Sequence, residues 1–369
     1  MHYFTFAEKD TTLYEASSSL NAGLDEILEV RKEVSDSGDS INVSRILIKF
    51  DLNFISSSMV KGTINNPKFY LNLYDAHSTE LATSQSLYAY PVSASWIMGE
   101  GRSYDNPITT EGASWKYRDG ETDGTIWPGT VSSSGAQWYD GAGYEASHSL
   151  GHTTSDIRMD VTDIVNSWLG GSTKITNEGF IVKRSGSVGN NHTGSDEGST
   201  TRYGNLSFFS SDTHTKYPPT LETVWNDSKW STGSLSALSQ ANIEDMTIYM
   251  KGLRPEYKEK SKVKFRLVGR ERFPAKTYST TPSNLTIKTL PSASSFYSIK
   301  DAETDDVIVP YGTGSYISCD STGNYFNLWL DGYQPERYYT IEYRVRSGSG
   351  TVDEIDQYFD EGFTFKVSQ

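Results

Sequence analysis

Cysteine is almost missing from this sequence, and its scarcity excludes internal disulfide bonds as a source of stability. Cys319 is the only cysteine in 369 residues, so stability must come from packing or from assembly with other chains. A chain without disulfides is typical of proteins that fold inside a cell rather than along a secretory pathway.

Long hydrophobic runs are missing as well. No segment approaches the roughly 18 consecutive apolar residues that a membrane-spanning helix needs. Met1 leads directly into the letters HYFTF, without the basic and apolar regions of a secretion signal. We therefore expect a protein that is made in a cytoplasm, carries no secretion signal and does not insert into membranes.

Positive charge is in short supply. The chain has 33 Lys and Arg against 47 Asp and Glu, which gives a net charge of −14. Residues 1–231 carry 17 basic and 29 acidic residues, a net of −12, and residues 232–369 carry 16 and 18, a net of −2. An acidic protein repels phosphate groups, so we expect no nucleic-acid partner.

One segment is an exception to this acidity. Residues 251–276 hold ten Lys or Arg against three Glu. Basic residues alternate along part of the segment, so on a strand they would share one face. A solvated strand face is the favoured interpretation, and a docking face for an acidic partner is the alternative. The alternating residues are Lys260, Lys262, Lys264 and Arg266.

Catalytic motifs are also missing, since no nucleophile elbow, phosphate loop or dinucleotide fingerprint occurs. The segments GLRPE (252–256) and GYQPE (332–336) each place a Glu directly after a Pro, and a glycosidase needs two carboxylates about 5–10 Å apart. The same letters are typical of a turn that starts a strand, because Gly252 and Gly332 permit unusual backbone angles and Pro fixes φ. We favour the turn, with Tyr338 or Tyr339 as a tyrosine corner that bonds back to the loop. We predict that the protein is not an enzyme.

Aromatic residues and short alternating segments are what the chain has in abundance. It contains 24 Tyr and 8 Trp, and segments such as RILIKFDL (45–52) and YYTIEYRV (338–345) alternate or run apolar. This composition and period predict an all-β chain. Residues 156–171 have helical spacing instead, which predicts one short helix in the N-terminal half.

The length and a change in composition predict two domains. Residues 226–243 are rich in Ser and small residues, and they interrupt the strand pattern. We predict a jelly-roll-like β-sandwich with one short helix in residues 1–228 and a linker in residues 229–244. Residues 245–369 are predicted to form an immunoglobulin- or fibronectin-like β-sandwich.

Six aromatic residues in a Gly-, Ser- and Asp-rich stretch are the candidate site residues. Flat aromatic faces beside Asp, Asn and Ser are typical of sugar-binding surfaces. Long loops also use Trp and Tyr to pack onto a sheet, and protein interfaces concentrate the same residues. We favour packing, with glycan contact and partner contact as the alternatives. The six residues are Trp96, Trp115, Tyr117, Trp127, Trp138 and Tyr139.

Three acidic loops, 119–124, 195–198 and 303–306, have the oxygen-rich composition of calcium-binding loops. None has the spacing of an EF-hand, and solvated turns are the favoured interpretation. We therefore predict no cofactor, with a structural calcium ion as the alternative.

Ordered segments of the N-terminal half carry a resemblance to a known family. They are AEKDTTLYEASSSLNAGLDEILEV, SRILIKFDL, YPVSASWIMGEGR, GASWKYRDG, MDVTDIVNSWLGG, NEGFIVKR and LSFFSSDTHTKYPPTLETVW. With these segments, residues 1–228 resemble the DNRLRE-type domain, a β-sandwich related to carbohydrate-binding modules. Such domains serve both as sugar binders and as structural units.

The second half carries a different resemblance, through KFRLVGRERFPAKTYST, CDSTGNYFNLWLDGYQPERYYTIEYRV and GFTFKV. It is similar to parts of virion structural proteins of T4-like marine bacteriophages. This resemblance implies a structural virion protein that assembles in many copies with other virion proteins. The tail or baseplate is favoured over the neck or capsid surface. The alternative is a glycan-binding module for adhesion to host surface polysaccharide.

Overall fold

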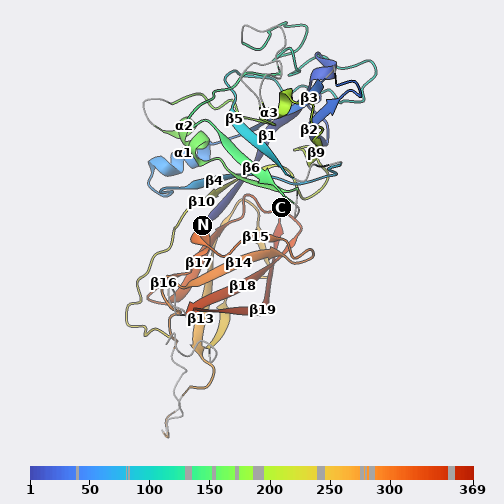
Figure 1. Cartoon of the computed structure of the whole chain (residues 1–369). Helices are drawn as coiled ribbons and strands as arrows, with labels where there is room; N and C mark the ends of the chain where they lie inside the picture. The colour runs from blue at the N-terminus through green and yellow to red at the C-terminus, as the bar shows by residue number, and fades with distance from the viewer. Residues whose placement is uncertain are drawn as a thin grey trace. The chain divides into compact units, whose positions relative to one another are not determined.

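The computed structural model describes residues 1–38, 41–79, 81, 84–128, 135–151, 155–170, 174–185, 195–238, 246–274, 278, 281, 287–347 and 354–369. Strands dominate these residues and helices are few and short, as Figure 1 shows. The predicted all-β class is therefore confirmed. In these ranges the longest helices have eight residues, and no helix is long and apolar enough to cross a bilayer.

The chain forms two compact units, and each unit is made of segments that are not consecutive in the sequence. The N-terminal unit comprises Thr5–Lys61 and Lys68–Glu222, and the C-terminal unit comprises Met1–Phe4, Gly62–Pro67 and Thr223–Gln369. The chain therefore passes between the two units four times.

The predicted linker, 229–244, is described as far as residue 238. This part bonds to the C-terminal unit, because Ser231 N donates to Cys319 O at 3.0 Å and Leu238 N donates to Thr289 O at 2.8 Å. Leu238 is also buried in that unit's core. Residues 239–244 of the predicted linker lie outside the described residues.

The N-terminal unit is built on a ten-stranded sheet in which the main path runs β6-β5-β8-β3-β1-β10-β4-β7. β2 pairs with β3 and β9 off this path. β6 and β7, at the two ends of the path, lie in contact, so the sheet nearly closes on itself. The bounds are β1 (His2–Tyr14), β2 (Ile27–Val34), β3 (Ile41–Phe50), β4 (Lys68–Leu73), β5 (Gln85–Pro91), β6 (Ala146–Leu150), β7 (Ile157–Asp160), β8 (Phe180–Lys183), β9 (Gly204–Phe209) and β10 (Thr220–Val224).

Two eight-residue helices stand beside this sheet, where the sequence predicted one. The predicted helix is α2 (Thr162–Leu169), which buries Ile164, Val165 and Trp168. The helix that was missed is α1 (Asn53–Val60), whose Ser-rich sequence gives little apolar periodicity. Just before it, Asp51 Oδ1 accepts a hydrogen bond from Asn53 N at 2.9 Å in a local turn, and Ile55 anchors the helix in the interior. A single turn, α3 (Ser195–Gly198), follows later.

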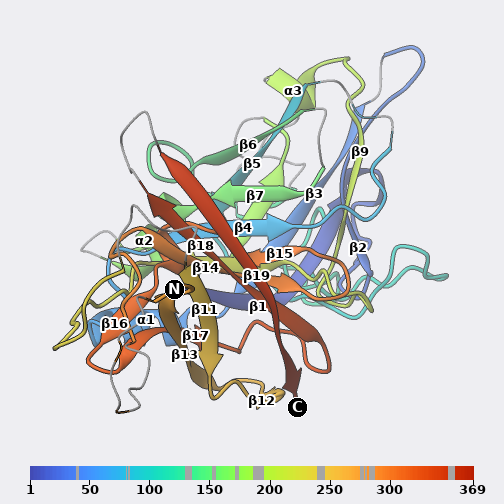
Figure 2. The same ribbon diagram turned by 90° about the horizontal axis from the view of Figure 1, so that it is seen from below.

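The C-terminal unit is a β-sandwich of two sheets. One has the order β11-β13-β17-β16 and the other the order β12-β19-β18-β14-β15; the strands are labelled in Figures 1 and 2. The bounds are β11 (Met246–Lys251), β12 (Glu256–Lys258), β13 (Lys262–Glu271), β14 (Ser295–Asp301), β15 (Val307–Val309), β16 (Ser318–Asp320), β17 (Gly323–Trp329), β18 (Tyr338–Ser347) and β19 (Ile355–Ser368).

A single aromatic core joins these two sheets. Phe326 of β17 stacks on Tyr297 of β14 with ring centroids 4.1 Å apart, and Phe265 of β13 lies 5.2 Å from Phe365 of β19. All four side chains are almost completely buried. The β-sandwich predicted for this half is therefore confirmed.

The two predicted strand-entry turns, one before β12 and one before β18, are partly as expected. Tyr339 Oη donates to Gln334 O at 3.1 Å, which is the predicted tyrosine corner. Gly252 has a φ of +72°, as predicted for its turn. The prediction was wrong for Gly332, which does not have a positive φ. It needs glycine because a Cβ there would collide with Phe4 of the same unit.

Candidate functional site

Four of the six candidate aromatic residues lie in a core. Trp96, Trp115, Trp127 and Trp138 are each 3% exposed. They pack with apolar residues of β1, β3, β5 and β8, and the indole of Trp127 donates to Ser114 O at 2.9 Å. Their flat faces are therefore covered, as the packing alternative requires.

The other two candidates lie nearer the surface. Tyr139 is 36% exposed and its ring lies 5.7 Å from that of Tyr144. Tyr117 is half-buried, with Lys116 Nζ 4.8 Å from its ring centroid. These two rings remain available for contact with a ligand or a partner.

Two of these tryptophans, Trp115 and Trp138, pack against a group of buried charges that the sequence did not predict. Arg45 of β3 forms two hydrogen bonds to Glu197 of α3, Nε to Oε1 at 3.1 Å and Nη2 to Oε2 at 2.8 Å. Lys183 of β8 lies 3.1 Å from the same carboxylate. Trp115 and Trp138 cover the guanidinium at 4.7 and 5.1 Å from Cζ.

The charges of this cluster support one another despite their burial. Burial alone raises the pKa of Glu197, but Arg45 and Lys183 together hold it below its usual value. Burial lowers the pKa of Lys183 to about 8; Glu197 partly offsets this effect, and Arg45 adds a smaller lowering. The paired carboxylate fixes α3 to the sheet, and so it also fixes the neighbouring Asp196.

Asp196 lines a polar pocket of about 530 Å³ beside β5. On that strand Ser86, Tyr88 and Tyr90 alternate, so they point to the same side of the sheet. Tyr203, which precedes β9, and Glu145, which precedes β6, contribute further walls. The full lining is Ser84, Gln85, Ser86, Tyr88, Tyr90, Glu145, Ser185, Asp196 and Tyr203.

Hydrogen bonds hold the walls of this pocket in place. Tyr90 Oη donates to Glu145 Oε2 at 2.8 Å, and Tyr203 Oη donates to Asp196 Oδ1 at 3.0 Å. Burial and the bond to Glu145 raise the pKa of Tyr90, so its hydroxyl stays protonated and keeps donating. Among the described residues, neither carboxylate has a partner on its second oxygen. Those oxygens can therefore accept from a ligand.

Arg184, which lies behind the pocket, orients the side-chain amide of Gln85. Arg184 Nη1 donates to Gln85 Oε1 at 2.6 Å, which turns the amide nitrogen of Gln85 away from the guanidinium. Arg184 also lies 5.0 Å from the ring centroid of Tyr203. Burial lowers the pKa of Arg184 to about 10, and at neutral pH the guanidinium stays charged.

The chemistry of this pocket fits a polyhydroxylated ligand. Tyr88 and Tyr203 are half-buried and present part of their rings, whereas Tyr90 is 5% exposed and packs with the tryptophans. Tyrosine faces pack against the C–H faces of sugars, while carboxylate, amide and serine groups bond hydroxyls. The alternation in QSLYAYP is the sequence signal that could have indicated one wall. The other walls come from segments about 60 to 120 residues away.

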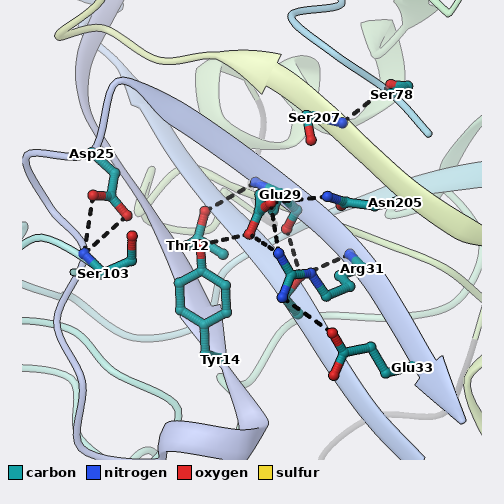
Figure 3. Close-up of polar contacts among 11 residues, drawn as sticks. Thr12, Tyr14, Asp25, Glu29, Arg31, Glu33, Ser78, Ser103, Asn205 and Ser207 are labelled. Atoms are coloured by element: carbon teal, nitrogen blue, oxygen red, sulfur yellow. Dashed lines mark hydrogen bonds and ion pairs between the residues drawn. The ribbon is translucent and has the colours of Figure 1, made fainter.

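A second polar cluster, centred on Glu29 of β2, is structural. Figure 3 shows its carboxylate among Tyr14, Arg31 and Asn205. Tyr14 Oη donates to Oε2 at 2.9 Å, Asn205 Nδ2 donates to Oε1 at 2.9 Å, and Arg31 Nη2 lies 3.0 Å from Oε1. Both oxygens are thus occupied by protein donors, so this cluster ties β1, β2 and β9 together.

The two Pro-Glu turns lie against the same strand, β19. Both glutamates are exposed, and both turns bond to β19, since Lys366 N donates to Pro255 O at 2.8 Å and Glu336 N donates to Val367 O at 2.7 Å. Lys366 also forms an ion pair with Glu336. The turns therefore hold the last strand from both sides.

Within the part of the chain that the structure describes, no three His, Cys, Asp or Glu side chains are grouped to hold a metal ion. The structural calcium ion in the loops 119–124, 195–198 or 303–306 stays a prediction. No protein-family model matches the chain, and no curated protein is significantly similar to it.

Proposed function

We propose that this protein is a non-catalytic structural component of a tailed-bacteriophage virion, in the tail or baseplate rather than in the neck or capsid surface. The observation that carries the proposal is that one chain passes between two β-rich units four times. Units on a single linker move freely by default. Several covalent crossings share a mechanical load that one linker would carry alone, which suits a particle protein.

Sheet edges support assembly with other virion proteins in many copies. β12 and β15 are three-residue strands at the two ends of the five-stranded sheet. An edge strand offers unpaired backbone groups to which a strand of another chain can add. The short length of these two edges limits unspecific pairing and favours a dedicated partner.

The test is the protein composition of particles of the phage whose genome encodes this chain. Gradient-purified particles are washed with high salt and quantified by mass spectrometry. We expect this chain at a fixed ratio to the major tail proteins. Its absence from particles, with normal amounts in infected cells, would overturn the proposal. So would a gene that lies outside any phage genome.

A second candidate function, adhesion to host surface polysaccharide, is favoured by the polar pocket beside β5. Its tyrosine walls and its two carboxylates are the groups that bind sugar hydroxyls. A virion protein can carry such a pocket, so the two functions are compatible.

Titration of the full chain against host polysaccharides tests this second function. We expect saturable binding that Tyr88→Ala and Tyr203→Ala each weaken by about two- to tenfold, since an aromatic contact contributes about 0.5–1.5 kcal/mol beyond the area that it buries. Tyr249→Ala is the matched control, because Tyr249 is 41% exposed on the C-terminal unit. Binding that survives both pocket variants would refute the assignment. Release of new reducing ends from the bound polysaccharide would contradict both non-catalytic functions.

A further inference from the structure

The outer face of one sheet in the C-terminal unit carries a row of cations. On β13, Lys262, Lys264 and Arg266 point away from the core, while Phe265 and Leu267 point into it. The neighbouring strand β11 adds Lys251, which pairs with Arg266. We name these four cations the basic strip. Three of the basic residues that were predicted to share one strand face belong to this strip, and they do share that face.

Aromatic rings of β17 lie beside the basic strip. The cross-strand partners of Lys262 and Arg266 are Trp329 and Tyr325. Lys262 Nζ lies 4.7 Å from the Trp329 ring centroid, and Lys264 Nζ lies 3.6 Å from that of Tyr325. These contacts hold the lysine side chains along the outer face of the sheet, with their ammonium groups over the rings.

One carboxylate accompanies the basic strip among the described residues. Asp320 of β16 bonds Arg266 through both oxygens, at 3.0 and 2.8 Å, and it also accepts from Lys264 at 3.0 Å. Lys251 and Lys262 have no ion pair with a described residue. The strip therefore keeps a net positive charge and can accept further carboxylates.

The rest of the chain provides the complementary surface. The N-terminal unit holds 28 Asp and Glu against 16 Lys and Arg, a net of −12, and the C-terminal unit holds 19 against 17, a net of −2. The basic strip is thus the main concentration of positive charge on a strongly acidic chain. Its best complement within the known sequence is the N-terminal unit of another copy.

One part of the N-terminal unit combines exposed carboxylates with exposed apolar side chains. It is the loop layer 97–126, tied together by bonds from Ile97 N to Arg118 O at 2.9 Å and from Glu121 N to Thr110 O at 3.1 Å. It holds six acidic and three basic residues, and Glu121 and Asp123 are exposed. Its apolar side chains that are more than half exposed are Ile97, Tyr104, Ile108 and Ile126.

We propose that the basic strip of one copy docks onto the loop layer 97–126 of a second copy. The lysines and Arg266 would pair with the loop carboxylates, and Tyr325 and Trp329 would pack against the exposed apolar side chains. Because two different surfaces meet, the contact is head-to-tail and builds a ring or a filament of copies. This contact would account for the assembly in many copies that is part of the proposed function, and it rests on that part of the proposal.

Substitutions that reverse the charge of each surface test this contact in the purified full chain. Analytical ultracentrifugation over a range of protein concentrations measures the mass of the assembled species. At low salt we expect the native chain to self-associate, and we expect association to weaken as salt rises because ion pairs at a rim are screened. Lys262→Glu with Lys264→Glu should weaken association by about tenfold or more, since like charges then face each other. Glu121→Lys with Asp123→Lys should do the same.

Combining the two pairs of substitutions distinguishes the proposed contact from a general effect of charge. The four substitutions in one chain, or a mixture of the two double variants, should restore association, because opposite charges again meet. Lys61→Glu with Lys68→Glu is the matched control, since it makes the same change in net charge at exposed lysines outside both surfaces; it should leave association unchanged.

Several results would overturn the inference. The contact is absent if the native chain stays monomeric at low salt. It is also absent if association survives the substitutions in the basic strip, or if combining the two pairs of substitutions does not restore association. Binding of the strip to heparin or to DNA without self-association would assign it to a different polyanion. None of these results depends on particles, so each leaves the proposed virion function to its own test.

Discussion

Arg45 and Glu197 form a two-point salt bridge across 152 residues of chain, with Nε–Oε1 at 3.1 Å and Nη2–Oε2 at 2.8 Å. Both side chains are at most 1% exposed. The pair joins β3 to α3, and α3 carries Asp196 into the polar pocket. The stability of the N-terminal unit and the shape of the pocket therefore depend on the same carboxylate.

Glu197→Gln tests this dependence. The substitution keeps the shape of the side chain but leaves Arg45 and Lys183 buried without a counter-charge, so we expect a loss of about 3–5 kcal/mol in the free energy of unfolding. Urea denaturation measures the loss. Glu100→Gln, at an exposed position, should change stability by less than about 0.5 kcal/mol. Equal stability of the two variants would show that the pair is solvated rather than buried.

Asp10 of β1 makes the stability of the N-terminal unit depend on pH. Burial raises the pKa of this carboxyl to about 7, although it accepts hydrogen bonds from Ser211 N at 2.7 Å and from Ser211 Oγ at 3.0 Å. The unfolded group has a pKa near ~3.9. Between these values the folded state binds the extra proton, so the free energy of unfolding falls as pH rises from about 4 to 7, by up to about 4 kcal/mol.

Asp10→Asn removes this proton-binding difference. Chemical denaturation at closely spaced pH values should give a flatter stability profile for the variant between pH of about 4 and 7, with the largest gain over the native chain near neutral pH. Asp123→Asn is the control because it changes an exposed carboxylate, whereas Asp51→Asn would alter the bond that Asp51 accepts from Asn53 N at the start of α1. An unchanged slope in Asp10→Asn would contradict the raised pKa.

The tyrosine corner of the C-terminal unit gives a third prediction. Tyr339→Phe removes the hydroxyl that bonds Gln334 O at 3.1 Å, and we expect a loss of about 1 kcal/mol in the free energy of unfolding. Tyr338→Phe is the neighbouring control, because Tyr338 is 50% exposed. A larger loss in Tyr338→Phe than in Tyr339→Phe would refute the role of the corner.

The buried tryptophans give a fourth prediction. Trp115→Ala removes a ring that packs on Arg45 and leaves a cavity, so we expect a loss of about 3–5 kcal/mol in the free energy of unfolding. Tyr139→Ala, at a ring that is 36% exposed, should lose less than about 1 kcal/mol. If Trp115→Ala kept full stability while losing polysaccharide binding, Trp115 would be a ligand contact and not a core residue.

Much of the fold could be predicted from local patterns. Alternation in RILIKFDL and in YYTIEYRV predicts strands because successive side chains of a strand point to opposite faces, and β3 and β18 follow. The spacing of Ile164, Val165 and Trp168 predicts α2 for the corresponding reason in a helix. α1 gave no such signal, because its Ser-rich sequence has little apolar periodicity and its position depends on the burial of Ile55.

The candidate site could be predicted much less well. The sequence showed that six aromatic residues gather in one stretch, but not that four of them are buried, nor that Trp115 and Trp138 pack against Arg45 and Lys183. The pocket beside β5 was missed, because its walls come from four separate parts of the chain. No periodic pattern links residues that meet only after the sheet has formed.

The letters of this chain fix its acidity, its lack of disulfides, the alternation of its strands and the placement of Lys262, Lys264 and Arg266 on one strand face. Each of these properties depends on composition or on residues two to four positions apart. The pairing of Arg45 with Glu197, the bond from Tyr339 to Gln334 and the four passages between the units belong to the folded chain. These features depend on which strands become neighbours in the folded chain. The burial that results then determines whether a tryptophan packs in a core or contacts a ligand.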